Sequence, residues 1–165
     1  MEKSGYAESF RDLLAYQKAR ELAQEIFEVS KCFPKEEMYS LTDQIRRSSR
    51  SVGAQIAEAW AKRRYEKHFV SKLTDADGEQ QETQHWLETA VDCHYLSQEE
   101  AQQLINKCAR VGRLLGGMIN KSTLFCSQPN ILRESQPHYF TKEYPSTDNG
   151  SPITDNRSPT TDNEE

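Results

Sequence analysis

The chain has 165 residues, enough for one domain with a modest core, and holds only 7 Gly and 6 Pro. Most of the prolines lie from Pro129 onward, so the first three quarters lack the turn residues of an all-β fold. Residues 126–165 contain 3 basic and 7 acidic residues, which leaves 18 basic and 19 acidic residues in the body. The net charge of −5 therefore comes largely from the tail and does not exclude a polyanionic partner for one basic face.

The first half of the body contains two segments whose apolar residues recur at alternating spacings of three and four, which predicts amphipathic helices. The first helix is expected over about 12–31, with Asp12 as its N-cap and Pro34 beyond its end. Its apolar stripe consists of Ala15, Ala19, Leu22, Ile26, Val29 and Phe33. The second helix is expected to begin near Ser40, paired with Asp43 in a cap. Its stripe consists of Leu41, Ile45, Ser49, Val52, Ile56 and Trp60, and small residues beside it let another helix approach closely.

Two further segments show the same periodicity and complete a predicted bundle. The third helix, about 65–95, has the stripe Phe69, Leu73, Ala76, Gln80, Thr83, Leu87 and Ala90. Asp77 and Gln80 predict a buried polar network that fixes the helix register. The fourth begins with the capping box Ser97-Gln98-Glu99-Glu100 and has the stripe Ala101, Leu104, Cys108, Val111, Leu115 and Met118. Gly116-Gly117 is expected to be a C-terminal break or a close-packing point.

The connections between these helices are short, so successive helices should run antiparallel. The sequence therefore predicts an all-α, up-down-up-down four-helix bundle over 12–125, preceded by a short lead over 1–11. Residues 126–165 are predicted to form a disordered tail. That tail contains a seven-residue repeat of Pro, Ser/Thr, Asp and Asn in which every unit holds proline and no position is consistently apolar.

One pair of residues on the predicted third helix has the spacing of metal ligands. Glu82 and His85 form a Glu-x-x-His step of the kind that ligates dinuclear metal centres in helical bundles. Such a centre needs a second Glu-x-x-His on another helix, and His68, His94 and His138 all lack a Glu three residues before them. Nucleotide-binding glycine loops and nucleophile motifs are also absent from the sequence. We therefore expect no enzyme activity, no metal and no cofactor.

The sequence also contains no run approaching the roughly 18 apolar residues of a membrane span. The start, MEKSGYAESF, has no apolar core of a signal peptide, so a cytoplasmic protein without membrane contact is expected. The four cysteines have no CxxC spacing, and in a reducing compartment they are expected to be small apolar side chains: Cys32, Cys93, Cys108 and Cys126.

Charge is segregated along the body. The stretch 46–72 is rich in cations, whereas 75–100 carries eight carboxylates and no Lys or Arg. Candidate binding residues for a nucleic acid or a protein partner are Arg46, Arg47, Arg50, Lys62, Arg63, Arg64 and Lys67. Nearby, Trp60, Tyr65 and Phe69 can either stack on bases or pack in the core. The alternative is that the cations pair with the acidic third helix of the same or a neighbouring subunit.

Two adjoining runs of sequence carry a family resemblance. The run FPKEEMYSLTDQIRRSSRSVGAQIAEAWAKRR and the later run SKLTDADGEQQETQHWLETAVDCHYLSQEE resemble the bacterial four helix bundle protein family, also called the 23S rRNA intervening-sequence protein family. The opening FRDLLAYQKARELA also fits, so the resemblance covers about 10–124. Members are similar to the accessory variability protein of diversity-generating retroelements. That similarity implies a barrel-like homopentamer that binds nucleic acid and a reverse transcriptase, with Arg46, Arg47, Arg50, Lys62, Arg63 and Arg64 as the matching positions.

These observations give two functional hypotheses. The first is a non-enzymatic, homo-oligomeric scaffold whose basic patch binds RNA, single-stranded nucleic acid or a nucleic-acid-processing enzyme. The second is a purely structural oligomer in which the basic and acidic faces of neighbouring subunits pair. Charge segregation motivates both.

Overall fold

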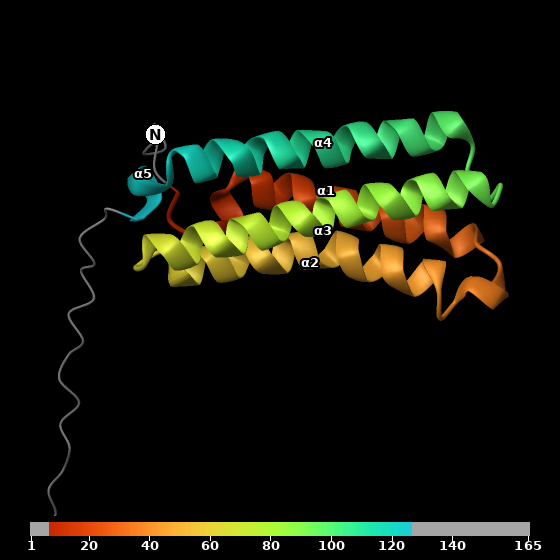
Figure 1. Ribbon diagram of the computed structural model, residues 1–165, viewed down its shortest axis with the longest axis horizontal. Helices are drawn as coiled ribbons and strands as arrows, with labels where there is room; N and C mark the ends of the chain where they lie inside the picture. The colour runs from red at the N-terminus through yellow and green to blue at the C-terminus, as the bar shows by residue number, and fades with distance from the viewer. Residues whose placement is uncertain (1–6, 127–165) are drawn as a thin grey trace, which may run out of the picture. The chain divides into compact units, whose positions relative to one another are not determined.

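The computed structural model describes residues 7–126, and these residues are helical without any strand (Figure 1). The four long helices are α1 (Leu14–Val29), α2 (Leu41–Lys62), α3 (Glu66–Asp92) and α4 (Gln98–Asn120). Four short elements accompany them. η1 (Phe10–Asp12) precedes α1, η2 (Ser30–Cys32) and η3 (Lys35–Glu37) connect α1 to α2, and α5 (Ser122–Cys126) follows α4. Successive helices run antiparallel and pack together, and α4 returns to pack on α1. The predicted four-helix bundle is confirmed, whereas the predicted tail lies outside the described residues.

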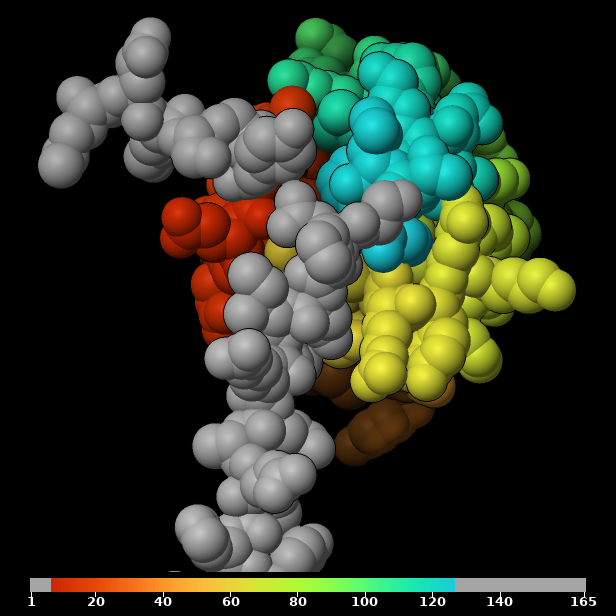
Figure 2. Space-filling model, turned by 90° about the vertical axis from the view of Figure 1, so that its left-hand side faces the viewer, coloured from red at the N-terminus to blue at the C-terminus, as the bar shows by residue number. Residues whose placement is uncertain are grey.

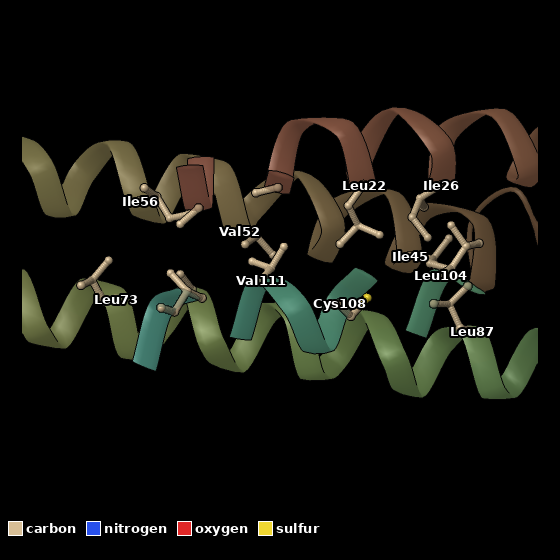
Figure 3. Packing of buried hydrophobic residues seen from close by; sticks show 14 of the residues in the cluster. Leu22, Ile26, Ile45, Val52, Ile56, Leu73, Leu87, Leu104, Cys108 and Val111 are labelled. Carbon is tan, nitrogen blue, oxygen red and sulfur yellow. The ribbon is translucent and has the colours of Figure 1, made fainter. Parts of the chain in front are cut away.

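The core follows from the apolar stripes. All seven stripe residues of α3 and all six of α4 are buried, and most of the α1 and α2 stripes are buried with them. Figure 3 shows Leu22 and Ile26 from α1 turned into the interior of the bundle, which Val52, Leu87 and Val111 from the other three helices also fill. Each fully buried aliphatic side chain contributes about 1.5–3 kcal/mol relative to an exposed one. Burial of these stripes therefore drives assembly of the bundle.

Two helix starts differ from the sequence prediction. Asp12 does not cap α1, because its carboxylate accepts from the backbone N–H of Ser9 at 2.8 Å and closes the capping box of η1. Leu13 occupies the N-cap position of α1 without a side-chain hydrogen bond. The extra turn of η1 was not predicted, and it takes the Asp12 side chain away from α1.

At the start of α2, Ser40 occupies the N-cap position but its side chain makes no capping bond. Instead, the Glu37 carboxylate accepts from the backbone N–H of Leu41 at 3.2 Å and from the Ser40 hydroxyl. The expected pair of Ser40 and Asp43 is therefore wrong. The reason is that η3 carries Glu37 over the helix N-terminus, where an anion is favoured.

The α3–α4 turn agrees with its prediction. Ser97 Oγ accepts from the Glu100 N–H at 3.2 Å, and Glu100 accepts from the Ser97 N–H at 3.0 Å, so the capping box is confirmed. Beyond the last residue of α3, His94 has a φ of 59°. This left-handed conformation reverses the chain between the two helices.

A polar layer lies inside the bundle, as Asp77 and Gln80 predicted. The Gln80 amide is buried and donates to Asp77 Oδ1 at 3.0 Å. Nearby, the buried Thr83 hydroxyl donates to Ser48 Oγ of α2 at 2.9 Å. On α4, a Cβ added to Gly112 would lie 2.9 Å from Gln80 Nε2. Gly112 is thus the close-packing glycine of α4.

The prediction for Gly116-Gly117 is wrong. The helix α4 continues through both glycines to Asn120, and no atom lies within 4 Å of a Cβ added at either. The chain then forms α5, where Phe125 stacks on the buried Phe69 with 5.6 Å between ring centres. Every described helix is too short or too polar to span a bilayer.

Candidate functional site

The predicted basic residues divide into two groups on the α2–α3 hairpin. Arg46, Arg47 and Arg50 lie in the first half of α2, whereas Lys62, Arg63, Arg64 and Lys67 lie around the turn into α3. At a rise of 1.5 Å per residue, about 25 Å of helix separates Arg46 from Arg63. The single basic patch suggested by the sequence is therefore two surfaces.

Two arginines of the first group, Arg46 and Arg50, contact residues of the α1 region. Arg46 Nε donates to Ser30 Oγ at 2.7 Å, and the Arg46 guanidinium carbon lies 5.0 Å from the centre of the Phe27 ring. Arg50 lies over the same ring at 5.6 Å. Because Ser30 is buried, the bond from Arg46 fastens the end of α1 to α2. The side chain of Arg46 therefore stabilises the packing of α1 against α2.

Arg47 is set against carboxylates. Its guanidinium lies 3.9 Å from Asp43 one turn earlier on α2. Burial raises the pKa of Glu79 on α3, the neighbouring Glu82 raises it further, and the charge of Arg47 opposes both. The ion pair of Arg47 is therefore with its own helix, and Arg47 acts on the acidic third helix only through its charge near Glu79.

Arg50 is exposed like Arg47, but of the three arginines it alone lines an open groove between α1 and α2. The groove has a volume of about 840 Å³. Its floor contains small side chains of α2, and its lining residues include Tyr16, Phe27 and Gly53. Arg50 lies beside this groove, well away from the α2–α3 turn.

Two cations of the second group, Lys62 and Arg63, are bonded to residues at the end of α2. Lys62 pairs with Glu58 at 2.5 Å, and the bonds from Lys62 and then Lys72 hold the pKa of the Glu58 carboxyl below its usual range. Arg63 donates to the backbone carbonyl of Trp60 at 2.7 Å and lies over the Trp60 ring at 4.1 Å. Both side chains serve the end of α2.

The other two cations of the second group, Arg64 and Lys67, differ from Lys62 and Arg63 in their contacts. Both are exposed, and within residues 7–126 neither has an ion-pair partner. The neighbouring carboxylate, Glu66, accepts from the Ser122 hydroxyl of α5 at 2.5 Å. Figure 2 shows this end of the bundle, where α5 (cyan) lies against the start of α3 (yellow). Glu66 bonds to Ser122, and neither Arg64 nor Lys67 forms an ion pair with it.

The three aromatic residues near the turn are also distinguished by the structure. Phe69 is fully buried against Phe125, and Trp60 is half-buried beneath Arg63. Tyr65, by contrast, is 60% exposed. Of the three, Tyr65 is the aromatic side chain open to a partner.

The charge segregation of the sequence becomes a polarity along the bundle. The turn 62–67 and the α4–α5 junction carry five cations, Lys62, Arg63, Arg64, Lys67 and Lys121, against Glu66. The segment around η1, at the same end, adds Arg11 against Glu8 and Asp12. The opposite end, formed by the α1–α2 connection and the α3–α4 turn, carries five carboxylates, Glu36, Glu37, Asp92, Glu99 and Glu100, against Lys31 and Lys35. One end is therefore basic and the other acidic. In Figure 1 the α2–α3 turn and α5 form the left end, and the α1–α2 connection and the α3–α4 turn form the right end.

The Glu-x-x-His step lies on the surface of α3. Glu82 and His85 are both exposed, and Glu82 accepts from the indole N–H of Trp86 at 3.0 Å. A dinuclear centre needs its ligands directed into the bundle. Across residues 7–126, no three His, Cys, Asp or Glu side chains are grouped to hold a metal ion.

The fold and site define a helical-bundle protein with a basic end, where Arg64, Lys67 and Lys121 are exposed and have no ion-pair partner within residues 7–126. The family model of the 23S rRNA-intervening sequence protein matches residues 11–117, and the chain belongs to that family. This confirms the family resemblance, while its link to retroelements stays a prediction.

A solved structure gives the same result. It is a protein of unknown function from the S23 ribosomal protein family of Bacteroides thetaiotaomicron VPI-5482. The two chains are 30% identical, with a TM-score of 0.59 over 65% of this chain and 96% of that one. Comparison with curated proteins found no match.

Proposed function

We propose that this protein is a non-enzymatic, homo-oligomeric scaffold that binds RNA, single-stranded nucleic acid or a nucleic-acid-processing enzyme through its basic end. The observation that carries the proposal is the exposure of Arg64 and Lys67 without an ion-pair partner among residues 7–126. Phosphate groups bind such cations because contact releases condensed counterions. The family resemblance adds a pentamer and a reverse transcriptase as the proposed assembly and protein partner.

The sharpest test reverses the two available charges. The variant R64E/K67E keeps Arg63 on Trp60 and Lys62 on Glu58, so its fold should be retained. The matched control is R110E/R113E, which changes two exposed arginines with the same spacing on α4. Both variants alter the net charge equally, which removes overall charge as an explanation.

Affinity for a short single-stranded RNA is measured by fluorescence anisotropy across a salt series. Wild-type affinity should fall steeply with salt, and R64E/K67E should bind at least about tenfold more weakly with a salt slope lower by about 1.4. The control should change affinity far less. Equal affinities of wild type and R64E/K67E would contradict the proposal.

A second function is favoured by the polarity of the bundle. A basic end and an acidic end on one subunit are complementary, which supports a structural oligomer held by charge pairing between subunits. Multi-angle light scattering separates the two functions. Under the first, R64E/K67E keeps the wild-type mass and loses RNA affinity; under the second, the mass falls.

A further inference from the structure

We propose that Tyr65 is a stacking platform for an unpaired base, with Arg64 and Lys67 holding the neighbouring phosphates. This inference rests on the proposed nucleic-acid binding and names its substrate class, single strands in preference to duplexes. It goes beyond charge, because charge alone does not distinguish a single strand from a duplex.

The backbone of Tyr65 is fixed while its ring is open. Its N–H donates to the carbonyl of Lys62 at 3.0 Å, and its carbonyl accepts from the N–H groups of His68 and Phe69, each at 3.0 Å. The side chain is nevertheless 60% exposed. With the backbone held and only two rotatable bonds in the side chain, the tyrosine loses little conformational freedom when a planar ligand covers its ring.

The groups around the ring suit a nucleotide. The Arg64 guanidinium carbon lies 5.8 Å from the ring centre, and the His68 ring meets the Tyr65 ring edge-on at 71° with 5.8 Å between centres. Lys67 lies two residues further along the same helical turn and is exposed. Exposed aromatic rings interleaved with cations are the combination by which proteins bind single strands.

Other aromatic residues show why this combination is informative. Trp60 has the Arg63 guanidinium at 4.1 Å over its ring, so its neighbouring cation is already in place against it. Tyr39 is 95% exposed, more than Tyr65, but it lies at the acidic end beside Glu36 and Glu37. A polyanion is repelled there, so exposure alone does not make a stacking site.

The stacking role implies selection of unpaired bases. In a duplex the bases are already stacked on one another, and the protein meets mainly phosphates and grooves. In a single strand each base offers a free face to an aromatic ring. Tyr65 should therefore contribute to single-strand binding and not to duplex binding.

The experiment compares Y65A and Y65W with wild type, using Y39A as the matched control at the acidic end. The probes are a short oligouridylate, an abasic oligomer with the same number of phosphates, and an RNA duplex of equal length. Loss of one stacked base should weaken oligouridylate binding by Y65A about tenfold. Binding of the abasic oligomer and the duplex should be unchanged, Y65W should retain oligouridylate affinity, and Y39A should behave as wild type.

The outcomes separate this inference from the proposed function. If Y65A binds oligouridylate as tightly as wild type while R64E/K67E does not, Tyr65 is no stacking platform and phosphate binding stands. An equal loss for oligouridylate and abasic oligomer would also overturn stacking, since the abasic probe has no base. If wild-type protein binds none of the probes at low salt, the proposed nucleic-acid binding and the inference both fail.

Discussion

The packed body of the bundle and the α2–α3 turn use the same kinds of side chain for opposite purposes. In the packed body, Arg46 is bonded to the buried Ser30 at the end of α1, and the Gln80 amide is bonded to Asp77. At the turn, Arg64 and Lys67 are exposed without ion-pair partners in the described part of the chain. Polar groups in the first region stabilise the fold, and those in the second are available for binding.

The difference teaches that a count of cations along a helix does not measure a binding surface. Arg46 and Arg64 are both arginines of the same predicted patch. An arginine bonded to a buried hydroxyl must break that bond before it can reach a phosphate. Arg64 lies near the exposed Tyr65 ring, with no hydrogen bond or ion pair of its side chain among residues 7–126, and its cost is smaller. The following predictions test this division, beginning with the largest expected change.

Gly112→Ala should destabilise the packed body of the bundle by disturbing its buried polar layer. The added Cβ would lie 2.9 Å from Gln80 Nε2 and 3.2 Å from Asp77 Oδ1, so the buried hydrogen bond between them must rearrange. Overpacking of this kind costs up to about 3 kcal/mol, and the higher helix propensity of alanine offsets up to about 1 kcal/mol, so the free energy of unfolding should fall by about 2 kcal/mol. Urea unfolding followed by circular dichroism measures the change.

Gly116→Ala is the matched control, since its Cβ meets no atom within 4 Å. On the same helix, this change should raise the free energy of unfolding by up to about 1 kcal/mol. Equal stability of the two variants would show that the polar layer does not constrain α4. Neither variant should alter nucleic-acid affinity at the turn.

Arg46→Ala should lower the free energy of unfolding by about 1.5 kcal/mol, because it removes a charge-assisted bond to Ser30 and the contact with Phe27. Affinity for single-stranded RNA should stay the same. Arg47→Ala, one residue along the same helix, loses the exposed pair with Asp43 and the charge that acts on Glu79, and it should cost less than about 0.5 kcal/mol. A loss of RNA affinity in R46A without loss of stability would reverse our assignment of the two regions.

The acidic end should show a smaller, pH-dependent effect. The pKa of Glu37 is lowered by the hydrogen bond from Ser40, then by the N–H of Leu41. A lowered carboxyl pKa in the folded state stabilises the fold above the unfolded-state pKa, and this contribution is lost as pH falls through the lowered value. The melting temperature of wild type should therefore fall more steeply below the usual carboxyl range than that of Glu37→Gln.

Glu36→Gln provides the comparison, since Glu36 is exposed in the same 3₁₀ turn. Its melting temperature should follow the wild-type pH profile. Parallel profiles for wild type and Glu37→Gln would mean that the Glu37 carboxylate does not stabilise the start of α2.

Much of the fold could be predicted because helical periodicity is local. The stripes of α3 and α4 were assigned residue by residue, and the Ser97–Glu100 box depends on groups three residues apart. Asp77 and Gln80 could be recognised because two polar residues interrupt an otherwise apolar face. Their role inside the bundle follows from the same spacing.

The errors concern contacts made between elements. Asp12 and Ser40 are common capping residues, but the short turns η1 and η3 changed which side chain reached each helix end. Close packing was predicted at the adjacent glycines Gly116 and Gly117, but it is Gly112 that faces the polar layer. The helix α5 was missed because a five-residue element has too few positions to show a period.

By itself, the sequence determined that four amphipathic helices form, which faces they bury, and that cations gather between residues 46 and 72, since these properties depend on composition and local spacing. Only the tertiary structure decided which charges remain available. Ser30 lies far from Arg46 in sequence, and Ser122 is still farther from Glu66, yet these contacts commit one arginine to the core and engage the acid beside Arg64 and Lys67. Long-range packing leaves Tyr65 open while it buries Phe69, because burial depends on what the rest of the chain places against each side chain.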